Sequence, residues 1–148
     1  MNTKYVTSLE ISKKLKDLGV TQESEFYWGK QLGFGGNNFR LDTRGDLIRY
    51  EMIITEVFGE KLFEEKYKYE MFISAYLTDE LLEILPSAIE DEDETFRLTI
   101  EKTGENLYPY EVAYRMNIET LGISYRNELS NALGKMLITL IEQGLYKL

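Results

Sequence analysis

The chain has neither cysteine nor histidine among its 148 residues. Without cysteine there is no disulfide bond and no thiolate metal site, a composition that suits a reducing cytoplasm. Without either residue, the Ser-His-Asp triad, the Cys-His dyad and the ordinary zinc hydrolase site are excluded. Carboxylate pairs remain available for acid–base chemistry, but 26 acidic residues give no basis for selecting two. The sequence therefore indicates no catalytic residue.

Long apolar runs are also missing. No stretch approaches the roughly 18 uninterrupted apolar residues of a membrane-spanning helix. The opening residues Met1–Tyr5 are not followed by the apolar run of a signal peptide. We therefore expect no membrane span and a cytoplasmic location. With 43% hydrophobic residues the chain has enough material for one core, so we expect a single domain over residues 1–148.

The charge is strongly acidic and partly concentrated in one run. The formal net charge is −9 and the sequence pI is about 4.7. Five adjacent carboxylates contribute to it: Glu90, Asp91, Glu92, Asp93 and Glu94. We interpret this acidic run as a solvated loop, with a patch that docks a basic protein or mimics nucleic acid as the alternative. Because phosphate backbones repel an acidic chain that lacks a separate basic face, we expect no specific nucleic-acid binding.

The acidic run begins like a calcium-binding loop but does not complete one. Asp91 and Asp93 have the spacing of the first two ligands. The sixth position would be Phe96, where glycine is needed, and the twelfth would be Lys102, where a bidentate glutamate is needed. We therefore expect no metal site, and no other pattern in the sequence indicates a cofactor.

The first clearly marked helix occupies residues 7–18. Thr7 is predicted to cap it, with Glu10 completing a capping box. One apolar stripe recurs at helical spacing, formed by Ile11, Leu15 and Leu18. Gly19 is predicted to end the helix in a left-handed conformation.

A helix-turn-helix is the competing interpretation of this region, because Leu18–Val20 is similar to the turn between its two helices. Two features oppose it. Leu15 stands where a small residue normally lets the helices cross. The would-be reading segment, residues 21–28, contains Glu23 and Glu25 and no lysine or arginine to contact phosphates or guanine edges.

The next part of the chain favours strands. The aromatic residues 26–28 indicate one strand, residues 33–38 a flexible turn, and residues 39–42 a short return strand. Residues 47–58 fit either an alternating strand or one helical face. We favour a strand there, because β-branched residues cluster in this segment, and we expect a break at Gly45.

Residues 70–85 predict a strand that enters the core and then a short helix, ended by Pro86. The clearest hairpin follows, with alternating strands over residues 96–101 and 108–116. Three tyrosines share one predicted face of its second strand: Tyr108, Tyr110 and Tyr114. They are expected to pack in the core. If that face is open, they would anchor a protein partner.

The last helix is predicted to start near Ser124 and to end at Gly144. Its broad apolar stripe should lie on the sheet. It contains Leu129, Ala132, Leu133, Met136, Leu137, Leu140 and Ile141. The predicted fold is therefore an α+β domain, with an antiparallel sheet of about four or five strands covered by the N-terminal and C-terminal helices.

Three segments of the chain resemble small uncharacterised proteins encoded by bacteriophages and prophages. They are Thr7–Trp28, Ala75–Pro86 and Ala132–Leu145, about a third of the sequence. The resemblance implies an origin in a mobile element and a location in the cytoplasm of a bacterial host cell. It carries no catalytic residue.

We therefore expect a phage or prophage accessory protein that acts without catalysis by binding a host protein, a defence component being one such partner. Two alternatives remain. One is a domain that binds a small molecule or performs carboxylate-based catalysis with acidic and tyrosine side chains in a pocket. The other is a structural or self-assembling phage component, and a homo-oligomer is compatible with each of these functions.

Overall fold

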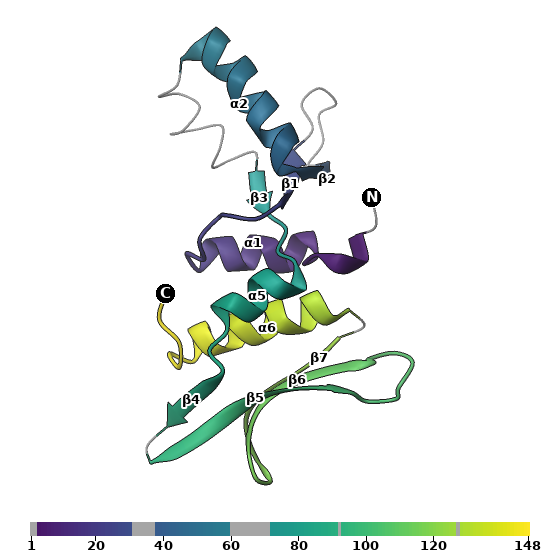
Figure 1. The fold of residues 1–148 in the computed structure, drawn as a ribbon, viewed down its shortest axis with the longest axis vertical. Coiled ribbons are helices and arrows are strands. Elements are labelled where there is room, and N and C mark those ends of the chain that lie inside the picture. The colour runs from purple at the N-terminus through teal and green to yellow at the C-terminus, as the bar shows by residue number, and fades with distance from the viewer. Residues whose placement is uncertain (1–2, 31–37, 60–71, 92, 127) are drawn as a thin grey trace.

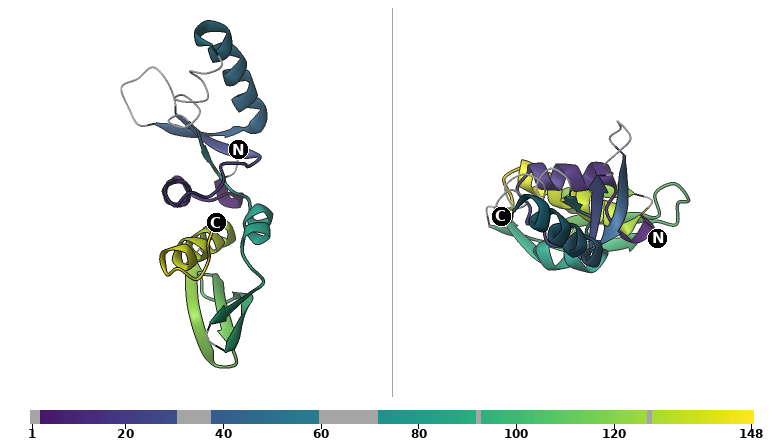
Figure 2. Two further views of the ribbon diagram at one scale, coloured as in Figure 1. Left: turned by 90° about the vertical axis from the view of Figure 1, so that its left-hand side faces the viewer. Right: turned by 90° about the horizontal axis from the view of Figure 1, so that it is seen from above.

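A computed structural model describes residues 3–30, 38–59, 72–91, 93–126 and 128–148. The molecule is elongated and built from stacked layers (Figure 1, Figure 2). Its helices are η1 (Thr3–Tyr5), α1 (Leu9–Asp17), α2 (Arg44–Phe58), α5 (Thr78–Ile84) and α6 (Leu129–Glu142). Its strands are β1 (Phe26–Lys30), β2 (Phe39–Thr43), β3 (Phe72–Ser74), β4 (Ala88–Asp91), β5 (Glu94–Lys102), β6 (Tyr110–Met116) and β7 (Glu119–Arg126).

The α+β class is confirmed, and the strands form two antiparallel sheets rather than one. The smaller sheet has the order β2-β1-β3 and the larger sheet has the order β4-β5-β6-β7. The predicted antiparallel pairs are both present, β1 with β2 and β5 with β6. From one end of the molecule to the other, the layers are α2, the smaller sheet, α1, the pair α5 and α6, and the larger sheet (Figure 1).

Helix α6 is the centre of the molecule. It packs on β6 and β7 on one side and on α1 and α5 on the other. Leu133 and Leu137 are fully buried, so the prediction that its apolar stripe lies on the sheet is confirmed. Its apolar surface is broad because it faces two layers. Helix α1 instead packs on α6 and β3, so only the C-terminal helix directly covers the larger sheet.

The crossing of α1 and α6 depends on a glycine. A Cβ atom added at Gly134 would lie 2.7 Å from Cγ2 of Ile11 and 3.0 Å from Cγ2 of Thr7. Contacts this short are not tolerated in a packed interior. Gly134 therefore allows the first and last helices of the chain to approach closely.

The start of α1 differs from the prediction. Ser8 is the cap, and its hydroxyl accepts a hydrogen bond from the Ile11 amide at 3.4 Å. Thr7 is instead fully buried, with its Oγ1 hydrogen bonded to Ser12 Oγ at 2.7 Å and accepting from the Tyr76 amide at 3.0 Å. The capping role of Thr7 was wrong because tertiary contacts use its hydroxyl. The helix stop is confirmed, since Gly19 has a φ of 87°.

Residues 44–58 form a helix, so the prediction of a strand over 47–58 and a break at Gly45 was wrong. Thr43 and Asp46 form a reciprocal capping box: the Asp46 amide donates to Thr43 Oγ1 at 3.3 Å, and the Thr43 amide donates to the Asp46 carboxylate at 3.1 Å. Side chains at helical spacing then pack on the smaller sheet, namely Leu47, Tyr50 and Ile54. Cap and packing together outweigh the β-branched composition. The predicted turn over 33–38 lies almost entirely outside the described residues.

The start of the last helix was also predicted too early. Ser124 lies in β7 opposite Val112 of β6, and α6 begins only at Leu129. The alternating and β-branched residues of 119–126 complete a sheet that already has β6 to pair with. This added strand is the outer edge of the larger sheet.

Two apolar cores result from this arrangement. The main core lies between the larger sheet, α6 and the helices above it. Its buried members are Leu15, Val20, Tyr76, Leu81, Leu85, Ile89, Phe96, Val112, Tyr114, Ala132, Leu133, Met136, Leu137, Ile138 and Leu140. The small core lies between α2 and the smaller sheet and contains Tyr27, Leu47, Ile54 and Phe72.

Candidate binding site at the free edge of the larger sheet

The three predicted tyrosines do not form one open face. Tyr114 is fully buried, its hydroxyl donates to the Pro86 carbonyl, and burial raises its pKa. Tyr110 is half-buried against the main core. Tyr108 precedes β6 and is 46% exposed. The expectation of core packing therefore holds for Tyr114, and only Tyr108 is open enough to contact a partner.

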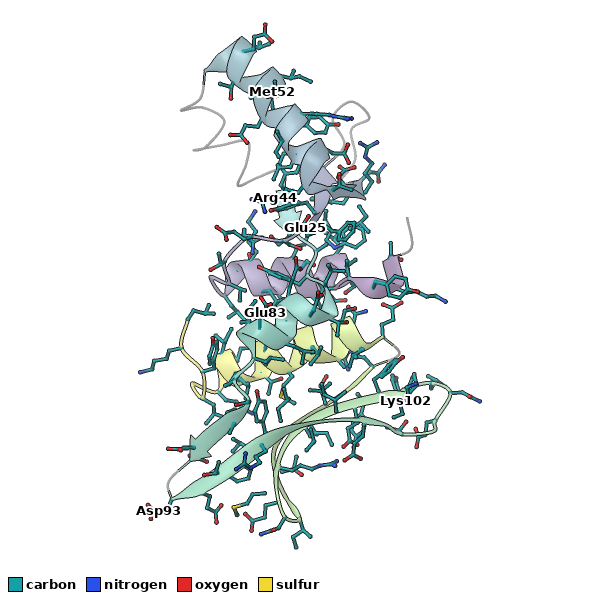
Figure 3. The ribbon with its side chains drawn as sticks, viewed as in Figure 1. Glu25, Arg44, Met52, Glu83, Asp93 and Lys102 are labelled. Carbon is teal, nitrogen blue, oxygen red and sulfur yellow. The ribbon has the colours of Figure 1, made fainter. Side chains whose placement is uncertain are left out.

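The acidic run forms the end of a hairpin. Glu90 and Asp91 finish β4, Glu94 begins β5 opposite Asp91, and Asp93 lies at the exposed tip (Figure 3). Glu92 lies outside the described residues. The four described carboxylates take part in no ion pair with the described part of the chain. This agrees with the prediction that the run stays outside the core.

The two edges of the larger sheet differ in how they are protected. Strand β4 is four residues long and ends in two carboxylates. Strand β7 is eight residues long, and the six residues between Glu119 and Arg126 are uncharged. Proteins usually protect an edge strand with lysine, proline, short length or a bulge. The single register shift of β7 falls near its Glu119 end, so residues 122–125 form a regular, uncharged edge that ends at Arg126.

A groove of about 520 Å³ follows this edge. Four consecutive residues of β7 line it, from Ile123 to Arg126. Because Glu111 of the neighbouring strand β6 and Lys135 of α6 also line it, the groove lies beside the Arg126 end of β7. Tyr108 and the turn after β5, near the labelled Lys102 of Figure 3, form the other wall. Ile123 and Tyr125 are 42% and 41% exposed and give the groove its apolar surface.

One residue that lines this groove has a buried hydroxyl without a partner among the described residues. Ser124 is only 3% exposed, it lines the groove, and its Oγ has no hydrogen-bond partner among the described residues. A buried hydroxyl without a partner costs free energy that a bound group could recover. The Glu111 carboxylate, also in the lining, is already ion-paired with Arg115. Arg115 in turn lies 3.0 Å from Glu101.

Two cations lie at one end of the groove. They are Arg126 and Lys135. The same two residues also line a second groove, of about 630 Å³, between α1 and α6. Neither side chain has a carboxylate within ion-pair distance in the described part of the chain. The guanidinium of Arg126 donates to the carbonyl of its neighbour Tyr125 at 2.6 Å. Glu105 and Glu111 line the same groove, so its lining carries both signs of charge.

The remaining chemistry of the described residues is limited. They contain no group of three or more acidic, histidine or cysteine side chains placed to hold a metal ion. Within the same residues, no helix is both long enough and apolar enough to cross a bilayer. Residues 21–25 form no helix and lead into β1, so the reading helix of a helix-turn-helix does not form. The chain is significantly similar to no protein-family model, no curated protein and no solved structure.

Sequence reasoning found Tyr108 but missed Ile123, Ser124 and Tyr125. These three residues were assigned to the connection into the last helix or to its first turn. The alternation of Leu121, Ile123 and Tyr125 was the available signal for a strand. The helical apolar pattern of the residues that come next obscured this alternation.

Proposed function

We propose that this chain is a small non-enzymatic protein that binds an extended segment of a partner protein along the free edge of β7. The observation that supports it is a long edge strand, β7, with a groove beside its last four residues. In this mode of recognition, the backbone of the partner segment adds a strand to the sheet. Main-chain hydrogen bonds give affinity, and pockets for alternate side chains give specificity.

The groove offers suitable contacts for such a segment. Ile123, Tyr125 and Tyr108 provide exposed apolar and aromatic surface next to the edge. Tyrosine at the centre of an interface contributes much of its binding energy.

The nature of the partner rests on the resemblance to phage and prophage proteins. From this resemblance we expect the partner to be a protein of the bacterial host cell, such as a defence component. The acidic run lies at the opposite edge of the same sheet, where it would favour the approach of a basic partner without occupying the groove.

The test combines affinity capture from bacterial lysate with substitutions at the edge. Ile123→Lys and Tyr125→Lys place charges along the strand and should reduce retention of a captured protein at least about tenfold. Ile118→Lys is the control, because Ile118 is 98% exposed in the turn before β7 and does not line the groove. Equal retention by all three variants would contradict strand addition at β7.

A small anionic ligand is the second candidate for this groove, because Arg126 and Lys135 meet there beside the Ser124 hydroxyl. The groove volume lies within the usual range for small-molecule sites. Mass spectrometry of the purified protein, before and after denaturation, distinguishes the two functions. A stoichiometric anion lost in Arg126→Gln and Lys135→Gln would favour the ligand.

A further inference from the structure

Helix α2 presents a second apolar surface, at the opposite end of the molecule from the larger sheet (Figure 1, Figure 2). Its inner face packs on the smaller sheet through Leu47 and Ile54. Four large apolar side chains on the rest of its surface are 49–66% exposed: Ile48, Met52, Ile53 and Val57. An exposed apolar cluster on one element is typical of an interaction site.

The outer row of α2 has an ordered chemistry. Arg44, Ile48, Met52 and Glu56 follow one another at four-residue spacing, so they share one side of the helix. From the N-terminal to the C-terminal end, the row therefore consists of a cation, two apolar side chains and an anion. Figure 3 shows Met52 on the outer part of α2 and Arg44 at its start.

Both charges are placed against the helix dipole. The N-terminus of a helix carries partial positive charge and the C-terminus partial negative charge. Arg44 is the first residue of α2, and Glu56 lies in its last turn, which contains no basic residue. Helix stability alone therefore disfavours both residues. Their positions are accounted for if each charge faces the opposite end of another helix.

Contacts within the chain do not account for the two charges. The guanidinium of Arg44 lies 4.0 Å from the carboxylate of Glu25, and the two side chains are 63% and 65% exposed. An ion pair this long and this exposed contributes little to stability. Glu56 is in no ion pair with any described residue. Both charges are open to a partner.

We propose that α2 binds α2 of a second copy of this chain in antiparallel orientation. A two-fold axis that passes between Ile48 and Met52 places Arg44 opposite Glu56 of the other copy, and Ile48 opposite its Met52. Such an interface is self-complementary, as two-fold symmetry requires. Rows at four-residue spacing are also the ridges that pack most often between helices. Each charge then lies at the favourable pole of the facing helix.

This interface is separate from the proposed site at β7, because α2 and the larger sheet form opposite ends of the molecule (Figure 1). A dimer through α2 would carry two β7 edges. It could therefore bind a partner with two sites more tightly than a monomer could. The self-association stands whether or not β7 binds a protein.

Sedimentation equilibrium over a concentration series tests the proposal. The wild-type chain should form dimers, and Arg44→Glu or Glu56→Arg should each weaken the dimer at least about tenfold, because two like-charged pairs then face each other. Each change places a charge that favours the isolated helix. Loss of dimer is therefore not a loss of folding, and circular dichroism should confirm an unchanged helix content.

Charge exchange supplies the matched controls. The double variant Arg44→Glu/Glu56→Arg should dimerise like the wild type. An equimolar mixture of the two single variants should form a heterodimer, since every facing pair is then of opposite charge. Ile123→Lys at the β7 edge should leave the dimer intact. A monomer at all concentrations overturns the proposal, and so does a dimer that ignores the α2 charges or is broken by Ile123→Lys.

Discussion

The two sheets of this molecule are covered very differently. The larger sheet packs on α6, which is itself covered on its other side by α1 and α5. The smaller sheet packs on α2, whose outer side is open and carries exposed apolar residues. The main core is therefore thick and continuous, whereas the small core contains four buried side chains. Stability is concentrated at one end of the molecule, and the other end depends on few contacts.

Several hydrogen bonds cross the junction between the two regions. The Trp28 indole donates to the Thr7 carbonyl at 3.0 Å, and the Lys16 ammonium donates to the Phe72 carbonyl at 3.1 Å. Tyr76 is buried at the same level, and its hydroxyl donates to the Thr21 carbonyl. Hydrogen bonds hold a fixed geometry but bury little apolar surface. They can therefore align the two regions while leaving them to unfold separately.

The largest expected difference comes from placing a charge in each core. Leu137→Asp should abolish cooperative folding of the whole chain, because an unpaired buried charge costs several kcal/mol, on the order of the total stability of a domain. Ile54→Asp should disorder only α2 and the smaller sheet. Heteronuclear NMR spectra report on both regions at once. Cooperative melting of Leu137→Asp near the wild-type temperature would show that α6 is not the centre of the fold.

Removal of the Thr7 hydroxyl should have the next largest effect. Thr7→Ala leaves the Tyr76 amide without its buried partner, removes the shorter hydrogen bond of Ser12 Oγ, and should cost about 1–3 kcal/mol. Ser8→Ala removes only the helix cap and should cost about 1 kcal/mol or less. Urea unfolding measures both, with Thr7→Ser as the variant that keeps the hydroxyl. A larger loss in Ser8→Ala than in Thr7→Ala would mean that the cap matters more than the junction.

The smaller sheet contains a buried carboxylate that should give a pH signal. Burial raises the pKa of Asp42, although Arg40, whose Nε donates to it at 2.6 Å, opposes the shift. A raised folded-state pKa adds stability at low pH that is lost as the pH rises through that pKa. Asp42→Asn should therefore be more stable than the wild type at neutral pH, by a margin that shrinks in acid. If the stability difference between Asp42→Asn and the wild type increased at low pH, the pKa of Asp42 would be lowered in the folded state, not raised.

The smallest effect is expected at the β4–β5 hairpin. Replacing Glu90, Asp91, Glu92, Asp93 and Glu94 with glutamine should change stability by no more than about 0.5 kcal/mol, because the described carboxylates are at the surface and repel one another. Thermal unfolding measures this. A slower association with the captured partner, with less salt dependence, would show that the run steers docking. A large loss of stability would instead reveal structural partners for these carboxylates.

Local signals predicted much of the larger region. The glycine stop of α1, the β5–β6 hairpin and the broad stripe of α6 each depend on residues close together in the sequence. The exposed position of the acidic run follows from mutual repulsion and was also predictable. The candidate site was only partly foreseen. Tyr108 was identified, but the edge strand that it faces was taken for the approach to a helix.

The predictions failed where a segment or a side chain was compatible with two local structures. Residues 47–58 fit both periods, and the choice of helix came from the capping box at Thr43 and from packing on the smaller sheet. Residues 119–126 became a strand because β6 offered a pairing edge. Thr7 could cap a helix, but its hydroxyl joins two distant segments instead.

The sequence alone determined the α+β class, the amphipathic first and last helices, the central hairpin and the exclusion of histidine and cysteine chemistry. These properties follow from composition and from patterns within a few residues, which neighbouring side chains impose directly. Only the tertiary structure decided that the strands divide into two sheets, that β7 is a free edge and that the outer row of α2 is exposed. These features depend on which segments pair and which faces remain uncovered, and such contacts join residues far apart in the chain.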